Sequence, residues 1–181
     1  MRHTYHSEQW IPYPIEVVFA FFADPENLPR LMPSWQKARI EEAAFTPPPP
    51  AVASTHLKSI VAGAGTRMTL SFRPFPYSPI RVSWEAEISE FVWNDRFCDT
   101  QLRGPFAYWH HCHSVSPEAR ANPSGTLIPG TLLHDDIEYE LPFGKLGDFV
   151  QRLFIAHQLS STFAYRRART SQLLRLHRPP T

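Results

Sequence analysis

The chain has 181 residues, 43% hydrophobic and 19% charged, which is enough to bury the core of one domain, so we expect a single domain over residues 1–181. A formal net charge of +1 provides no general attraction to nucleic acid, and we expect no nucleic-acid partner. Two cysteines are too few for a disulfide framework, and the chain has neither a signal-peptide core nor a run of about 18 apolar residues, so we expect a cytoplasmic protein without a transmembrane segment.

The first third of the chain predicts strands and short helices separated by prolines. Residues 3–11 alternate in character and predict a strand, and Pro14 is suited to the first turn of a helix, which a second short helix follows. Another strand is expected around 37–43. The proline-rich segment 46–59 resembles either a ligand for an aromatic groove or a stiff surface loop, and we favour the loop.

The middle of the chain predicts strands whose apolar side chains lie on one face. The segments 65–73, 80–91 and 131–141 alternate with period two, which is typical of half-buried strands. Segment 116–130 is rich in turn formers and predicts a mobile hairpin connection. The expected inward residues include Trp84, Asp135 and Tyr139.

A long helix is expected at the C-terminal end, from Lys145 to about Leu174, because the chain has no proline or glycine there after Gly147. Its periodicity places Leu153 and His157 on the side that faces the sheet. Residues 175–181 are expected to form a flexible tail.

The segment 97–115, FCDTQLRGPFAYWHHCHSV, is the most distinctive in the chain. A Gly-Pro dipeptide between two arms rich in strand-forming residues predicts an antiparallel hairpin. Odd-numbered side chains share one face of each arm, and we take this face as the inner one. Matching the faces places Gln101 opposite His111, Asp99 opposite His113 and Arg103 beside Trp109.

Asp135 reaches the same inner face if its strand pairs with the strand of His111. An unpaired polar group in an apolar site costs about 2–7 kcal/mol, so this polar cluster predicts mutual hydrogen bonds or a cavity. Two interpretations stay open. The polar residues form either a fully paired hydrogen-bond network that holds neighbouring strands together or part of a ligand pocket. His111, His113 and Asp135 also form a two-histidine, one-carboxylate set. Hydrogen bonds to Gln101, Asp99 and Asp135 already explain two inward histidines, so we expect no high-affinity metal and no cofactor.

Three stretches carry a resemblance to a known family: PYPIEVVFAFFADPENLPRLMP near the start, QLRGPFAYWHHCH in the middle, and DIEYELPFGKLGDFV before the last helix. With the order of elements, they resemble the START and birch-pollen-allergen helix-grip superfamily, also called SRPBCC, and within it a bacterial, cyclase/dehydrase-like ligand-binding group. The resemblance covers nearly the whole chain. It implies an α+β helix-grip fold, in which a curved antiparallel sheet of about seven strands wraps around a long C-terminal helix. The proline-rich segment is longer than the usual connection in that family.

The resemblance does not select a reaction, because the superfamily includes carriers, cyclases and binding proteins. We expect the chain to bind a hydrophobic or aromatic small molecule between sheet and helix. The alternative is a cyclase or dehydratase in which His111 or His113 moves a proton, with Asp135 as a further candidate catalytic residue. The expected ligand-binding residues are Trp84, Asp99, Gln101, Trp109, His111, His113, Asp135, Tyr139, Leu153 and His157.

Overall fold

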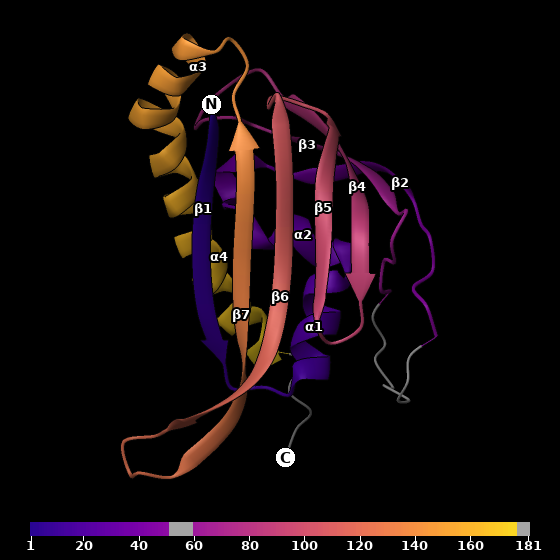
Figure 1. The fold of residues 1–181 in the computed structure, drawn as a ribbon, viewed down its shortest axis with the longest axis vertical. Helices are drawn as coiled ribbons and strands as arrows, with labels where there is room; N and C mark the ends of the chain where they lie inside the picture. The colour runs from indigo at the N-terminus through magenta and orange to yellow at the C-terminus, as the bar shows by residue number, and fades with distance from the viewer. Residues whose placement is uncertain (51–59, 177–181) are drawn as a thin grey trace.

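The structure, a computed structural model, describes residues 1–50 and 60–176. Its described part contains one antiparallel sheet of seven strands in the order β1-β7-β6-β5-β4-β3-β2. The helices lie on one side of this sheet (Figure 1). The strands are β1 (Arg2–Ile11), β2 (Arg39–Ala44), β3 (Arg67–Phe72), β4 (Val82–Val92), β5 (Arg96–Arg103), β6 (Tyr108–Ala121) and β7 (Leu127–Glu140). The helices are α1 (Ile15–Ala23), η1 (Pro25–Asn27), α2 (Leu28–Leu31), η2 (Ser34–Gln36), α3 (Lys145–Val150), η3 (Gln151–Ile155) and α4 (Ala156–Leu176). This arrangement confirms the predicted α+β helix-grip fold.

Helix α1 begins after Pro14, as the sequence predicted, and its apolar side builds one half of the core. Asp24 ends the helix, and its carboxylate accepts a hydrogen bond from the Glu26 amide at the start of η1. Phe19 packs edge-on against Phe91 and Phe97 from the sheet, with ring centroids 5.3 and 5.8 Å apart. These ring contacts join α1 to the inner face of the sheet.

The hairpin of β6 and β7 is longer than predicted. The segment 116–130 was expected to be a mobile connection, but the strands remain paired to Ala121 and Leu127, and only the residues between them form the turn. Asn122 supplies the turn chemistry: its side-chain oxygen accepts hydrogen bonds from the Ser124 and Thr126 amides. The paired strands project beyond the rest of the sheet as an arm (Figure 1).

The predicted register of β5 and β6 is wrong by two residues. Asp99 lies opposite His111, and Phe97 lies opposite His113. A shift of two residues keeps every side chain on its face, so the face pattern cannot detect it. The turn decides the register, because the side-chain amide of Gln101 donates to the Phe106 carbonyl at 2.7 Å and accepts from the Phe106 amide at 3.3 Å.

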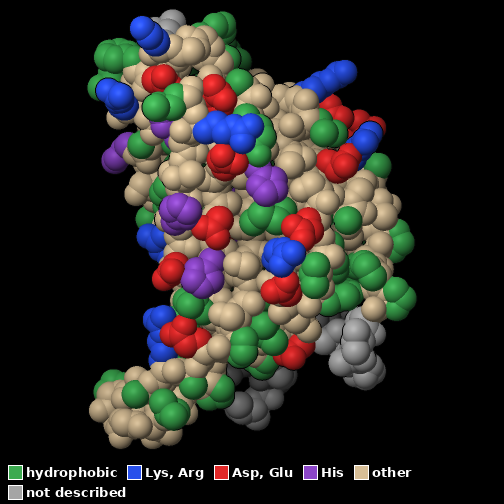
Figure 2. Space-filling view, in the orientation of Figure 1, with side chains coloured by type: hydrophobic (Ala, Val, Ile, Leu, Met, Phe, Trp, Pro, Cys, Tyr) green, Lys and Arg blue, Asp and Glu red, His purple; other side chains and the backbone are tan. Residues whose placement is uncertain are grey.

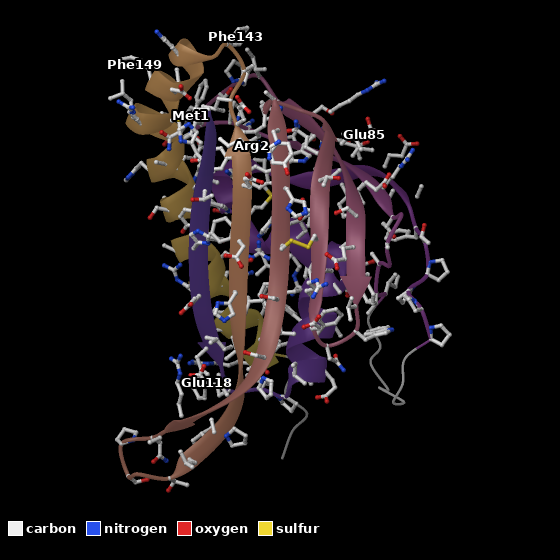
Figure 3. The ribbon with its side chains drawn as sticks, in the orientation of Figure 1. Met1, Arg2, Glu85, Glu118, Phe143 and Phe149 are labelled. Carbon is white, nitrogen blue, oxygen red and sulfur yellow. A yellow bond between two sulfur atoms is a disulfide. The ribbon has the colours of Figure 1, made fainter. Side chains whose placement is uncertain are left out.

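The two cysteines are bonded to each other, although the sequence analysis had considered them too few for a disulfide framework. Cys98 and Cys112 lie directly opposite each other on β5 and β6, with Cα atoms 4.1 Å apart, and form a disulfide. They lie on the sheet face opposite the helices, where the disulfide crosses the strands in Figure 3. The pairing of β5 and β6 brings the two cysteines together. The low number of cysteines, on which the sequence analysis relied, says nothing about this pairing.

The C-terminal helix has its predicted length but a different inner face. Residues 151–155 form a π-helical turn, η3, between α3 and α4. A wider turn changes the angular position of every later residue relative to the earlier part of the helix, so one α-helical period cannot describe both parts. Leu153 and His157 are therefore exposed, whereas Ile155, Leu159 and Phe163 face the sheet.

Two predicted loops lie partly outside the described residues. Residues 46–50 of the proline-rich segment contain no helix or strand, in line with the predicted connection, and 51–59 are not described. Arg175 and Leu176 belong to α4 rather than to the expected tail, and residues 177–181 are not described.

Candidate functional site

A cavity of about 310 Å³ lies between the sheet and α4. This volume falls at the lower end of the range for small-molecule sites, about 300–1,000 Å³. Its wall takes residues from helices α1 and α2, strands β3 to β6 and helix α4. Most of the wall is apolar, with Leu31, Met68, Leu70, Ala86, Ile88 and Phe163 among its buried members.

Aromatic rings form one side of the cavity. Trp84 on β4 meets Trp109 on β6 edge-to-face, with ring centroids 4.8 Å apart. Phe106, from the turn before β6, lies 4.9 Å from Trp109 and 5.5 Å from Trp84 by ring centroids. The three rings present faces and edges against which a flat ligand can pack.

His111 is the centre of a buried polar cluster at the inner face of β5, β6 and β7. Its Nε2 atom lies 3.2 Å from Asp135 Oδ1, and its Nδ1 atom lies 3.5 Å from Asp99 Oδ2. Both histidines and Asp135 are at most 5% exposed. The predicted convergence of these residues is therefore present, with Asp99 opposite His111 rather than His113.

His113 lies beside His111, with ring centroids 4.0 Å apart. Its Nδ1 atom lies 2.6 Å from Asp135 Oδ1, a close contact between imidazole and carboxylate. Arg166 of α4 brings a guanidinium nitrogen to 3.8 Å from the same carboxylate oxygen. Asp135 thus receives three cationic or potentially cationic neighbours from two secondary-structure elements.

The two histidines have opposite pKa shifts. Burial lowers the pKa of His111, but hydrogen bonds to Asp135 and Asp99 outweigh burial and raise it above 6.5. Burial lowers the pKa of His113 to about 4, helped by the charges of His111 and Arg166, and Asp135 only partly opposes this change. The cluster therefore favours a His111 imidazolium beside a neutral His113 imidazole.

Both carboxylates of the cluster are held in the ionised form. Burial favours protonation of Asp99, but the hydrogen bond and charge of His111 lower its pKa overall. Burial acts the same way on Asp135, but the charge of Arg166, together with the hydrogen bond to His111, brings its pKa well below the usual value. Two carboxylates are thus balanced by Arg166 and the His111 imidazolium, and the cluster has no net charge to attract an ionic ligand.

Other buried polar atoms at the cavity wall have no partner within the described protein. The Gln36 side-chain oxygen and the Trp84 indole N–H are both buried and unpaired. Gln36 is only 3% exposed, so its hydrogen-bond acceptor is buried within a wall that is mostly apolar. A buried unpaired polar group costs free energy, and a ligand that pairs with it recovers that cost.

The structure brings half of the predicted ligand-binding residues to the cavity wall: Trp84, Asp99, Trp109, His111 and His113. Asp135 and Tyr139 are buried in contact with these residues and do not line the cavity. Gln101 caps the β5–β6 turn. Leu153 and His157 do not line the cavity, because the π-helical turn places them on the outer side of the helix.

Sequence reasoning missed Gln36, Phe106 and Arg166, which all line the cavity. Phe106 lies in the Gly-Pro turn, which was treated only as a chain reversal. Arg166 belongs to a run of basic residues that was attributed to the helix end. Gln36 is in a short helical turn, η2, with no periodicity to show an inner face, so no signal in the sequence could have identified it.

Metal ligation by the cluster stays an untested possibility for which we make no proposal. Asp99, His111 and His113 each offer one ligand atom, and these atoms lie within 4.8 Å of one another. His111 and Asp99 already have partners in the protein. The expectation of no bound metal therefore stays a prediction, and metal analysis of untagged protein tests it.

Comparison with known proteins places the chain in a family. The sequence profile of the polyketide cyclase / dehydrase and lipid transport family matches residues 11–163. The chain belongs to this family. No curated protein matches it in sequence.

Solved structures show the same fold as this member of the cyclase / dehydrase family. TTHA0849 from Thermus thermophilus is 20% identical, with a TM-score of 0.60, over 92% of this chain and 96% of the other. The ginseng major latex-like protein 151 from Panax ginseng is 11% identical, with a TM-score of 0.56, over 94% of this chain and 96% of the other. At such identities these likenesses concern the fold alone. Among the described helices, none is long and apolar enough to cross a membrane.

Proposed function

We propose that the cavity binds an uncharged, largely apolar aromatic molecule that carries at least one hydrogen-bonding group. The observation that carries this proposal is a cavity of about 310 Å³ with a mostly apolar wall, two of whose lining residues, Gln36 and Trp84, each hold a buried polar atom without a partner. The aromatic side formed by Trp84, Phe106 and Trp109 supports ring packing, and membership of a cyclase and lipid-transport family supports a hydrophobic ligand.

The polar atoms indicate what the ligand must offer. The Trp84 indole can only donate, so it requires an acceptor, and the Gln36 oxygen requires a donor. A hydroxyl group supplies both functions. The balanced charges of Asp99, His111, Asp135 and Arg166 favour a neutral ligand, because an added ion would be buried without a counter-charge.

A matched pair of probes tests this proposal. We expect 2-naphthol to quench or shift tryptophan fluorescence and to bind about fivefold more tightly than 2-methylnaphthalene, which has the same shape but no hydroxyl group. Gln36→Met should remove most of this difference, whereas the same change at the exposed Gln172 should not. If neither probe binds, the proposed binding function is wrong.

A second function, proton transfer on the bound molecule, is favoured by one observation. Two neighbouring histidines at the cavity wall have opposite pKa shifts, and such pairs are typical of acid–base sites. Neutral His113 could accept a proton from a ligand, while the His111 imidazolium stabilises the charge that develops. If a turnover screen identifies a substrate, His113→Gln should lower kcat by about 10²–10⁴ with little change in ligand affinity. Unchanged kcat would exclude this role.

We also propose a cytoplasmic location, as the sequence indicated. Disulfides are rare in reducing compartments, so this location requires that the Cys98–Cys112 bond of the structure is reduced in the cell. Alkylation of protein trapped in cells should find both thiols reduced. Quantitative protection of both cysteines would contradict this location.

A further inference from the structure

The two cysteines share the outer face of the sheet, opposite the helices, with a histidine and a glutamate. Cys98 on β5 lies opposite Cys112 on β6 and opposite Glu90 on β4. His110 lies two residues before Cys112 on β6 and therefore on the same face. Histidine and acidic side chains intermix over this face of the sheet (Figure 2). Thiolate, imidazole and carboxylate are the groups that bind Zn²⁺ in proteins.

The distances between these side chains are close to those around a tetrahedral zinc ion. Zinc lies about 2.3 Å from a sulfur ligand and about 2.0–2.2 Å from nitrogen or oxygen, so a sulfur and a nitrogen or oxygen on one ion are about 3.6 Å apart. The Cys112 sulfur lies 3.8 Å from His110 Nε2, and the Cys98 sulfur lies 3.6 Å from Glu90 Oε2. The ligand atoms of both cysteines and His110 all lie within 4.8 Å of one another.

A neighbouring arginine holds Glu90 with one oxygen toward the cysteines. Arg96 Nε donates to Glu90 Oε1 at 2.8 Å, whereas Oε2 is the oxygen near Cys98. Hydrogen bonds of this kind orient the ligands of a metal site. A disulfide needs neither an imidazole nor a carboxylate beside it. The outer face therefore offers more ligand chemistry than a disulfide alone requires.

A cation can reach these groups from solvent. Cys98 is fully buried, but Cys112 and His110 are partly exposed, and the Glu90 side chain is 43% exposed. The open side of the site is thus lined by the imidazole and the carboxylate, and the buried thiol lies beneath them.

We propose that the protein with reduced cysteines binds one Zn²⁺ ion through Cys98, Cys112 and His110, with Glu90 as the fourth ligand. Two molecules of a small thiol, such as glutathione, reduce the disulfide and become one disulfide themselves. Each cysteine thiol then gives its proton to solvent as its sulfur binds the metal. The ion replaces the disulfide as the cross-link between β5 and β6.

This site is separate from the inner polar cluster. It lies on the other face of the sheet from His111, His113 and Asp135, for which we still expect no metal. It requires no ligand in the cavity, so it does not depend on the proposed function.

Zinc titration of the untagged full chain tests this proposal. After reduction with a phosphine and its removal under argon, the protein should bind one equivalent of Zn²⁺ in competition with a chromogenic chelator. The disulfide-bonded protein should bind none. Co²⁺ in place of Zn²⁺ should produce thiolate-to-metal charge-transfer absorption, which reports sulfur ligands directly. Zn²⁺ should also raise the melting temperature of the reduced protein, because it binds the folded state.

Variants of the ligands should weaken zinc binding in a defined order. Cys112→Ser removes a thiolate and should weaken it by at least about 100-fold, and His110→Gln by about 10- to 100-fold. Glu90→Gln should weaken it by about 10-fold, since water can take the place of a carboxylate. Cys112 and His110 are partly exposed, so these variants should stay folded, and circular dichroism checks this.

Matched controls come from two other histidines. His134 on β7 lies on the same outer face, and its side chain is 34% exposed, whereas His113 lies on the inner face. His134→Gln and His113→Gln should keep the zinc affinity and the cobalt spectrum of the unmodified protein. Absence of zinc binding by the reduced protein, cobalt binding without charge-transfer absorption, or equal losses in controls and ligand variants would overturn the proposal. Binding that survives Cys112→Ser but is lost in His113→Gln would also overturn it, because the metal would then lie in the inner cluster.

Discussion

Two consecutive aspartates on β7 each have a histidine at the same distance and differ in almost everything else. Asp135 lies on the inner face of the sheet, with Oδ1 2.6 Å from His113 Nδ1, and both side chains are about 5% exposed. Asp136 faces the opposite side of the sheet, with Oδ1 2.6 Å from His6 Nδ1, and both side chains are more than half exposed. The alternation of a strand thus places one pair in the buried interior and its neighbour in solvent.

This comparison shows that burial, rather than distance, determines what a contact between aspartate and histidine does. Water screens the outer pair, which therefore contributes little to stability. The inner pair has lost its hydration, so its members depend on each other and on His111 and Arg166. Inside the protein the same chemical groups can hold defined protonation states beside a ligand.

Removal of one carboxylate, on either the inner or the outer face of the sheet, should give the largest difference in stability between two variants. Asp135→Asn leaves buried cations without their partner and should lower the free energy of unfolding by about 3–5 kcal/mol. Asp136→Asn should change it by less than about 0.5 kcal/mol. Urea denaturation of both variants measures the contrast. Similar losses would mean that Asp135 is hydrated and that the inner cluster is not isolated from water.

The C-terminal helix allows the same comparison of stability for apolar side chains, one buried against the sheet and one exposed to solvent. Phe163 is 4% exposed and contacts His111, so Phe163→Ala should cost about 3 kcal/mol, at the lower end of the usual range because the residue borders a cavity. Leu153→Ala should cost less than about 0.5 kcal/mol. Thermal and urea unfolding measure both changes. A large loss of stability in Leu153→Ala would instead support the inner helix face that uninterrupted α-helical periodicity predicted.

Mild acid should destabilise the protein through His113. Its pKa is about 4 in the folded state and near 6.5 in the unfolded state, so the unfolded chain binds more protons between these values. Stability from this group is complete above about pH 6.5 and falls by at most about 3 kcal/mol as the pH decreases toward 4. His111 acts in the opposite direction, because its raised pKa gives stability that is lost as the pH rises through that value.

Urea denaturation across this pH range checks the prediction, with His113→Gln and the outer His6→Gln as the variant pair. The acid-induced loss should shrink in His113→Gln and stay in His6→Gln. The same loss in both variants would assign the acid response to other groups.

Asp99→Asn should have the smallest effect, a change in histidine titration. Because Asp99 lies opposite His111 and contacts its Nδ1 atom, the substitution should lower the pKa of His111 more than that of His113. Glu118→Gln, in the projecting arm, should leave both pKa values unchanged. NMR titration of the imidazole signals measures these changes. A larger change at His113 would support the register predicted from the sequence over the one in the structure.

The sequence could predict the order of elements and the inner faces of the strands, because period-two alternation and proline positions are local signals. It placed His111, His113 and Asp135 on one face correctly. It could not predict the register of β5 and β6, which depends on how Gln101 bonds to the turn. It also could not predict the helix face around the cavity, because a π-helical turn leaves no mark in a hydrophobic pattern.

Histidine NMR during titration with 2-naphthol tests the central claim that the inner cluster belongs to a ligand site. The account predicts that the ring signals of His111 and His113 shift as the probe binds, because both side chains line the cavity. Those of His6, His110 and His134 should stay in place, because these residues point to the other face of the sheet. Saturable binding that leaves the two inner histidines unchanged, or that shifts the outer three instead, would contradict the account.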